Sequence, residues 1–336
     1  MEIKYSISPF ELKTLTTKQI RDRILIKTVF APDEAVLTYS FDERFILGGI
    51  MPVRNEIRLE PQDEIRQEYF LQTREMGVIN IGGKGKIVAD GQVMEMDFED
   101  GAYIGCRTKD VVFSSEDPEK PAKFYVTSLL SFEKHPTVHI PAKKAQFNPC
   151  GNQTTASTRI VKKYIYKGGP VESDQLQMGI NSVQPGNVWN TIPTHSHKRR
   201  VECFMYYGMP EDAFYIEVIG EAKESRHVIL RNEQAIVSAA WQMHFGVGTT
   251  HVAADVVLGN VGPRVKAVME VLIELVSLAL FILFIVLAPR MIRVNIATIS
   301  PTLGIPMGYV YYAMLIGPIL MLFYTIVDIY ETSVGR

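Results

Sequence analysis

Three histidines and one glutamate have the residue types and spacing of a metal site. His195 and His197 stand two positions apart, Glu202 follows five positions later, and His244 comes further along the chain. Residues i and i+2 of a β-strand point to the same face, so a strand here would direct both imidazoles into one cavity. A turn would then have to bring Glu202 to the same place, and a separate strand would supply His244.

Three imidazoles and one carboxylate suit Zn²⁺, Mn²⁺, Fe²⁺ or Ni²⁺. The alternative is a pair of exposed loop histidines beside the basic run Lys198–Arg200. A His-x-His pair alone is a weak signal. Glu202 and His244, in surroundings typical of β-strands, favour the metal site.

Up to about residue 250 the sequence is typical of a mainly β protein. Short runs rich in β-branched and aromatic residues alternate with Gly, Pro, Asn and Asp, and turn signals recur about every ten residues. This pattern favours a sandwich or barrel, and two halves of similar style favour two jelly-roll-like sheets in tandem. An amphipathic helix is expected around Thr17–Asp22. The expected strands include Val78–Ile81, Gly85–Val88, Val111–Phe113, Lys123–Val126, Phe214–Ile219, His227–Leu230 and Ala235–Val237.

The composition narrows the class of protein further. The chain has 336 residues, of which 47% are hydrophobic and 21% charged, and its formal net charge is −2. This balance excludes a disordered polyelectrolyte and shows no basic excess, so no nucleic-acid partner is expected. Cys106, Cys150 and Cys203 form no CxxC pair and are typical of buried thiols in a reducing compartment. Met1–Tyr5 lacks the apolar segment of a secretory signal.

The chain changes character after residue 250. Between positions 271 and 288 only Glu274 is ionisable, and Ile305–Val327 carries no charge. Because about 20 mostly apolar residues cross a bilayer as a helix, we expect a transmembrane hairpin with spans at about 268–288 and 305–327. The alternative is two buried helices of a soluble core, but tyrosines toward both ends of the second run suit a membrane interface. The positively charged residues before and after the first run are equal in number. They therefore do not predict how the hairpin is oriented in the membrane.

The metal cluster also carries a resemblance to a known family. The metal motifs of the cupin superfamily are similar to the pattern Gly186-x8-His195-x-His197-x4-Glu202-x5-Gly208, followed by His244. Five further segments resemble the 5-keto-4-deoxyuronate isomerase family of pectin breakdown. These segments are Gly48–Pro52, Glu75–Gly83, Pro185–Thr191, Arg226–His227 and Asn232–Ala235.

This resemblance implies a bicupin fold, with an N-terminal cupin without metal at 1–140 and a metal-binding cupin at 141–250. It implies one Zn²⁺ per chain, with His195, His197, Glu202 and His244 as ligands. It also implies interconversion of 5-dehydro-4-deoxy-D-glucuronate and 3-deoxy-D-glycero-2,5-hexodiulosonate, for which a metal can polarise the substrate oxygens and stabilise an enediolate. Family members are oligomers, often hexamers, so a homo-oligomer is implied.

The substrate of that reaction carries a carboxylate, which an arginine can bind in bidentate fashion. Arg199, Arg200 and Arg226 are the candidate partners, with surface solvation as the alternative for each. We expect Glu202 to serve as a ligand rather than a base, because coordination lowers its basicity. The sequence identifies no catalytic proton-transfer residue and leaves a hydride shift open.

The tail, residues 251–336, resembles the small membrane subunit of TRAP-type solute transporters. His251–Val257, Pro263–Val265 and Ser300–Tyr311 carry this similarity. That subunit normally has four spans, of which only the second half is present. The isomerase-like part in turn lacks its family's last segment, which includes a strand of the second cupin. These two resemblances together imply a gene fusion with its junction near Thr250.

The fusion implies a catalytic domain in the cytoplasm, attached to the inner membrane by the tail, with a large TRAP permease subunit as a possible partner. One alternative is an inactive or sugar-binding metal cupin tethered to the membrane. The other is a transporter component whose soluble part is incidental.

Overall fold

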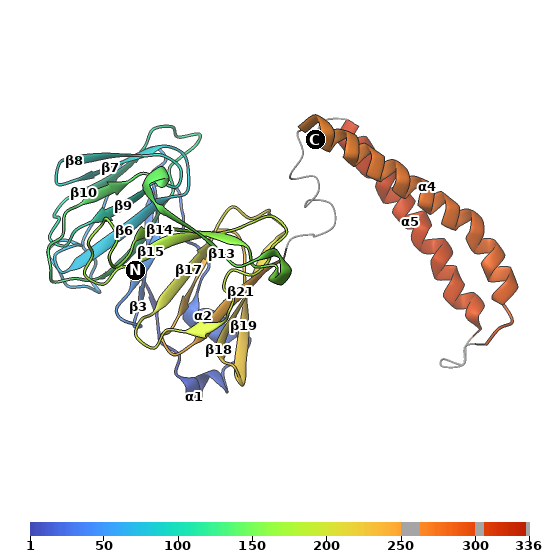
Figure 1. The fold of residues 1–336 in the computed structure, drawn as a ribbon, viewed down its shortest axis with the longest axis horizontal. Coiled ribbons are helices and arrows are strands. Elements are labelled where there is room, and N and C mark those ends of the chain that lie inside the picture. The colour runs from blue at the N-terminus through green and yellow to red at the C-terminus, as the bar shows by residue number, and fades with distance from the viewer. Residues whose placement is uncertain (250–262, 300–305, 334–336) are drawn as a thin grey trace. The chain divides into compact units, whose positions relative to one another are not determined.

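The computed structural model describes residues 1–249, 263–299 and 306–333 (Figure 1). The chain divides into two units, Met1–Thr250 and His251–Arg336. The first unit is built mainly of β-strands, and the second is built of two helices. The expected mainly β fold with a C-terminal helical segment is therefore confirmed.

Two sheets face each other across an apolar core in the N-terminal half. The larger sheet has the order β1-β3-β4-β11-β6-β9-β12, and the smaller one has the order β5-β10-β7-β8. Every second residue of Gly85–Ala89 (β7) is buried, as the period of a strand with one inward face requires. The inner faces share one cluster that includes Ile46, Met76, Phe113 and Phe124. The strands are β1 Glu2–Lys4, β3 Glu34–Ser40, β4 Ile46–Met51, β5 Ile57–Arg58, β6 Arg74–Asn80, β7 Gly85–Ala89, β8 Gln92–Met96, β9 Gly101–Ile104, β10 Val111–Ser115, β11 Phe124–Leu130 and β12 Val138–Ile140.

Three smaller sheets make up the C-terminal half, with the orders β16-β21-β18-β19, β13-β14-β15 and β17-β20-β2. Ile219, Val228 and Ile236 lie in the core of this half. Each of the expected strands in both halves overlaps an observed strand. The strands here are β2 Leu25–Ile26, β13 Gln146–Cys150, β14 Arg159–Ile165, β15 Met178–Val183, β16 His195–Ser196, β17 Glu202–Tyr206, β18 Phe214–Glu221, β19 Glu224–Leu230, β20 Gln234–Ser238 and β21 Met243–Thr249.

The N-terminal segment crosses from one half to the other. After β1, the helices α1 (Pro9–Leu12) and α2 (Thr17–Ile24) add apolar side chains to the core of the C-terminal half, and β2 pairs with β20. A capping box starts α2, because Thr16 and Gln19 exchange side-chain and backbone hydrogen bonds. The expected helix is thus confirmed. The boundary between the two cupins at residue 140 stays a prediction. It does not account for the N-terminal segment, which packs against the C-terminal half.

The two halves follow the same strand order with one difference. β11 lies between β4 and β6 and pairs with both. The matching strands of the C-terminal half are β15 and β17, which stand at the edges of two separate sheets. Within residues 1–249 no strand corresponds to β11.

The second unit contains two helices that contact each other, α4 (Pro263–Asn295) and α5 (Met307–Ser333). Among the described residues, Leu275–Asn295 is long and apolar enough to cross a membrane, with a mean hydropathy of 2.5. Leu315–Thr325 is a shorter apolar stretch, so the second span of the hairpin stays a prediction. The junction near Thr250, the segment His251–Val257 and the first residues of the motif that begins at Ser300 lie outside the described residues.

Candidate metal centre

The four candidate ligands come together from three parts of the C-terminal half. β16 pairs antiparallel with β21 so that His195 stands directly opposite His244. Side chains of directly opposed residues lie on the same face of a sheet. His197 follows β16, and Glu202 is the first residue of β17. The turn that the sequence required between His197 and Glu202 is therefore present.

Close contacts join all four side chains. His195 Nε2 lies 3.0 Å from His197 Nε2, and His197 Nε2 lies 2.9 Å from Glu202 Oε1. The other carboxylate oxygen, Oε2, lies 3.0 Å from His244 Nε2. One nitrogen from each of the three imidazoles falls within 4.8 Å of the others. This arrangement is compact enough for a single ion to be shared.

The protonation pattern fits a divalent metal. His195 Nδ1 lies 2.9 Å from the carbonyl oxygen of Pro193, an acceptor, so Nδ1 carries the proton and Nε2 presents a lone pair to the cluster. Burial lowers the pKa of His197, which favours the neutral imidazole that a metal requires. Burial alone would raise the pKa of Glu202. The hydrogen bond from His244 and the charge of Arg200 oppose burial, and the pKa of Glu202 is held down to about 2.

The three candidate arginines have different partners. Arg200 donates from Nη2 and Nε to Glu202 Oε1, at 2.8 and 3.1 Å, and from Nη1 to Gln177 Oε1 at 2.6 Å. Arg226 donates to Glu224 and to the carbonyl of Lys13. Arg199 is exposed. Substrate binding by any of them stays a prediction, whereas the structure places Arg200 on the carboxylate of a candidate ligand.

The Arg200–Glu202 contact leads to a prediction about metal affinity. Partners that orient metal ligands typically contribute 10- to 100-fold in affinity, so we expect Arg200→Met to weaken metal binding by roughly that factor. Competition with a chromophoric chelator measures the effect. Arg199→Met is the matched control, because its side chain is exposed and adjacent in sequence. Equal affinities of Arg200→Met and the unchanged protein would show that Arg200 does not orient Glu202.

A buried polar network next to the cluster was not found from the sequence. Tyr206 donates to a carboxylate oxygen of Glu217, and Asn190 Nδ2 donates to the Tyr206 hydroxyl at 3.0 Å. Asn190 Oδ1 accepts from the Gly246 N–H at 2.6 Å. Burial raises the pKa of Glu217 to about 7. The sequence offered one signal for this network, which was Glu217 itself. It is a charged residue at an inward-facing position of the otherwise apolar strand expected at Phe214–Ile219.

Glu217 should make stability depend on pH in a defined direction. In the unfolded chain its pKa lies near 4.5, and in the folded chain near 7, so between these values the unfolded state binds fewer protons. The contribution of Glu217 to the free energy of unfolding is complete below pH 4.5 and declines as the pH rises toward 7. The shift corresponds to roughly 3 kcal/mol. Glu217→Gln should flatten this part of the profile of the urea midpoint against pH.

That experiment requires metal-free protein, because a bound cation would change the pKa of a nearby carboxyl group. The difference between the two profiles isolates Glu217, since both proteins share every other titrating group. Identical slopes between pH 4.5 and 7 would contradict the assigned pKa.

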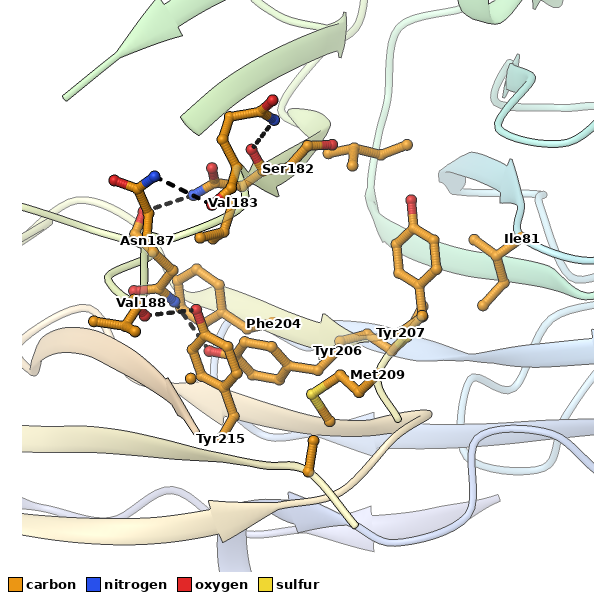
Figure 2. Close-up of a pocket in the computed structure, with 18 of the residues that line it drawn as sticks. Ile81, Ser182, Val183, Asn187, Val188, Phe204, Tyr206, Tyr207, Met209 and Tyr215 are labelled. Carbon is orange, nitrogen blue, oxygen red and sulfur yellow. Dashed lines mark hydrogen bonds between the residues drawn. The ribbon is translucent and has the colours of Figure 1, made fainter. Parts of the chain in front are cut away.

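A cavity of about 700 Å³ lies beside the network. Figure 2 shows Ser182 and Val183 on one side of it and Phe204, Tyr206 and Tyr207 on the other. Phe204 links the cavity to the metal cluster, because its ring centroid lies 5.1 Å from that of His244. The cavity is large enough for a small organic molecule.

Comparison with known proteins finds two families in one chain. Residues 25–251 match the KduI/IolB family. The chain belongs to the KduI/IolB family. Residues 246–334 match the DctQ component of tripartite ATP-independent periplasmic transporters, which confirms the fusion and indicates membrane association of the tail. The two matches overlap around the expected junction near Thr250.

Relatives in this family share the isomerase name. The 4-deoxy-L-threo-5-hexosulose-uronate ketol-isomerase of Caldicellulosiruptor bescii is 43% identical over 249 residues, which is 74% of this chain and 90% of the relative. The protein of that name from Lachnoclostridium phytofermentans is 45% identical over 249 residues, with the same coverage. An IolB-like protein of Salmonella typhimurium LT2, of known structure, has a TM-score of 0.52 and 12% identity over 68% of this chain and 93% of its own. That similarity supports the fold alone.

Proposed function

We propose that residues 1–249 catalyse a zinc-dependent ketol isomerisation in uronate breakdown. The reaction interconverts 5-dehydro-4-deoxy-D-glucuronate and 3-deoxy-D-glycero-2,5-hexodiulosonate. The observation that carries the proposal is the convergence of three imidazoles and one carboxylate in a chain 43% and 45% identical to two ketol-isomerases.

His195, His197, Glu202 and His244 would hold the ion. When bound, the ion would polarise the carbonyl and hydroxyl oxygens of the substrate. Arg200 donates to Glu202 Oε1, the same oxygen that lies 2.9 Å from His197 Nε2, and so helps to orient the Glu202 carboxylate. The carbonyl of Pro193 orients His195 in the same way. The ligand set is therefore held in place before any ion or substrate arrives.

An aldose–ketose shift moves one hydrogen between adjacent carbons and leaves the composition of the substrate unchanged. A general base that takes and returns a proton must exist in both protonation states near neutral pH. Glu217 is a buried carboxyl group whose pKa is raised by burial in the metal-free protein, and its hydrogen-bond partner Tyr206 lines the cavity. We propose that the Glu217–Tyr206 pair takes up and returns the proton that moves between the two carbons. Glu202 then acts only as a metal ligand.

An assay of the full-length protein in detergent tests this function. The substrate is prepared by lyase digestion of oligogalacturonate, and NMR follows its conversion. We expect turnover comparable to that of the C. bescii relative measured in parallel. No turnover by metal-loaded protein, under conditions in which the relative is active, would contradict the proposal.

The match to the DctQ component favours a second candidate function, as part of a transporter. We propose that α4 and α5 attach the isomerase to the inner membrane with residues 1–249 on the cytoplasmic side. A large permease subunit is the proposed membrane partner, and a homo-oligomer the proposed assembly. Co-purification with the large subunit and light scattering of the purified protein test these two points. If Glu217→Gln abolishes isomerisation but leaves the complex with the large permease subunit intact, the protein has both functions.

A further inference from the structure

One arginine of the C-terminal half is held in place by backbone carbonyls instead of by an acid. Arg159 is the first residue of β14 and is half-buried. Its Nη1 donates to the carbonyl oxygen of Ser157 at 3.1 Å, and its Nη2 donates to that of Ile192 at 3.3 Å. Among the described residues, no carboxylate lies within ion-pair distance of this guanidinium, and its Nε has no acceptor. A guanidinium has five N–H donors, so Arg159 can still bind an anion.

The register of β14 against β15 shows which way the Arg159 side chain points. Arg159 stands opposite Val183, and Val161, two residues further on, stands opposite Asn181. These four side chains lie on one face of the sheet, because opposed residues and residues two apart share a face. Asn181 Nδ2 donates at 2.7 Å to the carbonyl oxygen of Asn190, a member of the buried network beside the metal cluster. Arg159 therefore lies on the face directed at the candidate site.

The two faces of β14 have different surroundings. On the opposite face, Lys162 pairs with Glu99 of the N-terminal half, and Tyr164 donates at 2.6 Å to the carbonyl oxygen of Glu99. On the face of Arg159, the opposed Val183 lines the cavity (Figure 2). Lys162 thus serves the contact between the halves, whereas Arg159 faces the site.

The segment 192–195 connects Arg159 to the metal cluster. The carbonyl oxygen of Ile192 accepts from the guanidinium, and the next carbonyl oxygen, that of Pro193, lies 2.9 Å from Nδ1 of His195. Arg159 is therefore close to the cluster, but the structure shows it donating to backbone carbonyls and to none of the four candidate ligands. Such a placement suits a group that binds the far end of a substrate whose reacting end lies at the metal.

The substrate of the proposed reaction has an anionic group at its far end. The isomerisation takes place at the first two carbons of a six-carbon chain, and the carboxylate is the sixth carbon. An arginine binds a carboxylate through two parallel N–H···O bonds. Arg200 is already bonded to the candidate ligand Glu202, and Arg226 is bonded to Glu224. Arg159 has no such acidic partner.

We propose that Arg159 binds the carboxylate of a sugar acid whose reacting end lies at the metal. Nε and the second N–H of Nη2 donate to the two carboxylate oxygens, while the carbonyls of Ser157 and Ile192 hold the guanidinium in place. This inference rests on the proposed function, because that function puts the reacting carbons at the metal. Arg159 then selects acidic over neutral sugars and takes no part in the proton transfer.

Two sugars that differ in one group test the proposal on the full-length, zinc-loaded protein in detergent. D-Glucuronate has a carboxylate where D-glucose has a hydroxymethyl group, and a ligand-observed NMR titration measures the affinity for each without requiring turnover. Arg159→Met removes the charge, and Arg159→Lys keeps the charge but loses the paired donors. Lys163→Met is the matched control. Lys163 is a cation on the same strand and face, but its Nζ lies 5.6 Å from the ring centroid of Tyr166.

We expect the affinity for D-glucuronate to fall roughly 10- to 100-fold in Arg159→Met, by less in Arg159→Lys, and little in Lys163→Met. The affinity for D-glucose and the bound zinc should stay those of the unchanged protein. An isomerase assay without turnover, alongside these affinities, would contradict the proposed reaction but leave the carboxylate site in place.

Three results would overturn the assignment of Arg159. The first is an unchanged protein that binds D-glucuronate no more tightly than D-glucose. The second is an affinity for D-glucuronate that stays constant in Arg159→Met or falls equally in Lys163→Met. The third is a loss of zinc or of affinity for D-glucose in both Arg159 variants, because Arg159 would then support the fold of the site and not the carboxylate.

Discussion

His244→Ala is expected to lose bound metal and isomerase activity together. His244 is buried, contacts Glu202 at 3.0 Å, and supplies one of the three converging imidazole nitrogens. Its removal leaves two imidazoles and a carboxylate that is no longer held on one side. Because a polarising metal contributes several kcal/mol of transition-state stabilisation, we expect kcat to fall by roughly 1,000-fold or more. Metal analysis and the isomerase assay on the same sample measure both losses.

His227→Ala is the matched control for this substitution. His227 is an exposed histidine on β19, where it stands opposite Val218 and outside the cluster. We expect this variant to keep its metal and its activity. If His244→Ala binds one equivalent of metal with unchanged affinity, the assignment of His244 as a ligand is wrong.

Glu75→Ala is expected to cause a large loss of stability. The Glu75 carboxylate is fully buried and accepts four hydrogen bonds. Tyr103 donates at 2.7 Å, and the N–H groups of Asp174, Gln175 and Leu176 donate at 2.9, 2.7 and 2.6 Å. Removing the carboxylate leaves four donors without an acceptor. The expected loss is roughly 3–5 kcal/mol, the range for breaking a buried charged network.

Urea unfolding in one detergent measures this effect, with Glu95→Ala as its control. Glu95 is an exposed carboxylate on β8, so its removal should change the midpoint little. The two variants remove the same group of atoms and differ in burial and hydrogen bonding. A Glu75→Ala midpoint as close to that of the unchanged protein as the Glu95→Ala midpoint would contradict the structural role of the Glu75 carboxylate.

Local features of the sequence predicted much of the fold. Alternation along Gly85–Val88 and Phe214–Ile219 sets one inward face, so those strands follow from pattern alone. The pairing of Thr16 with Gln19 marks the start of α2. The core that α2 joins could not be predicted, because an apolar stripe on a helix does not specify its partner. The crossing of the N-terminal segment to the C-terminal half follows only from long-range packing.

The candidate site was predictable in part for the same reason. The pair His195 and His197 is visible as a spacing, Glu202 and His244 are candidates by residue type, and the family resemblance implied all four as ligands. The Arg200–Glu202 contact and the Tyr206–Glu217 pair depend on which strands become neighbours, and no local spacing encodes that.

Removal and restoration of metal tests the central claim most directly. The full-length protein is treated with chelator, assayed for isomerisation, and then titrated with Zn²⁺ while activity and bound metal are both measured. We predict that activity falls to background without metal and returns in proportion to metal bound, reaching its maximum at one equivalent per chain. Full activity in the metal-free protein would contradict a catalytic centre built from His195, His197, Glu202 and His244.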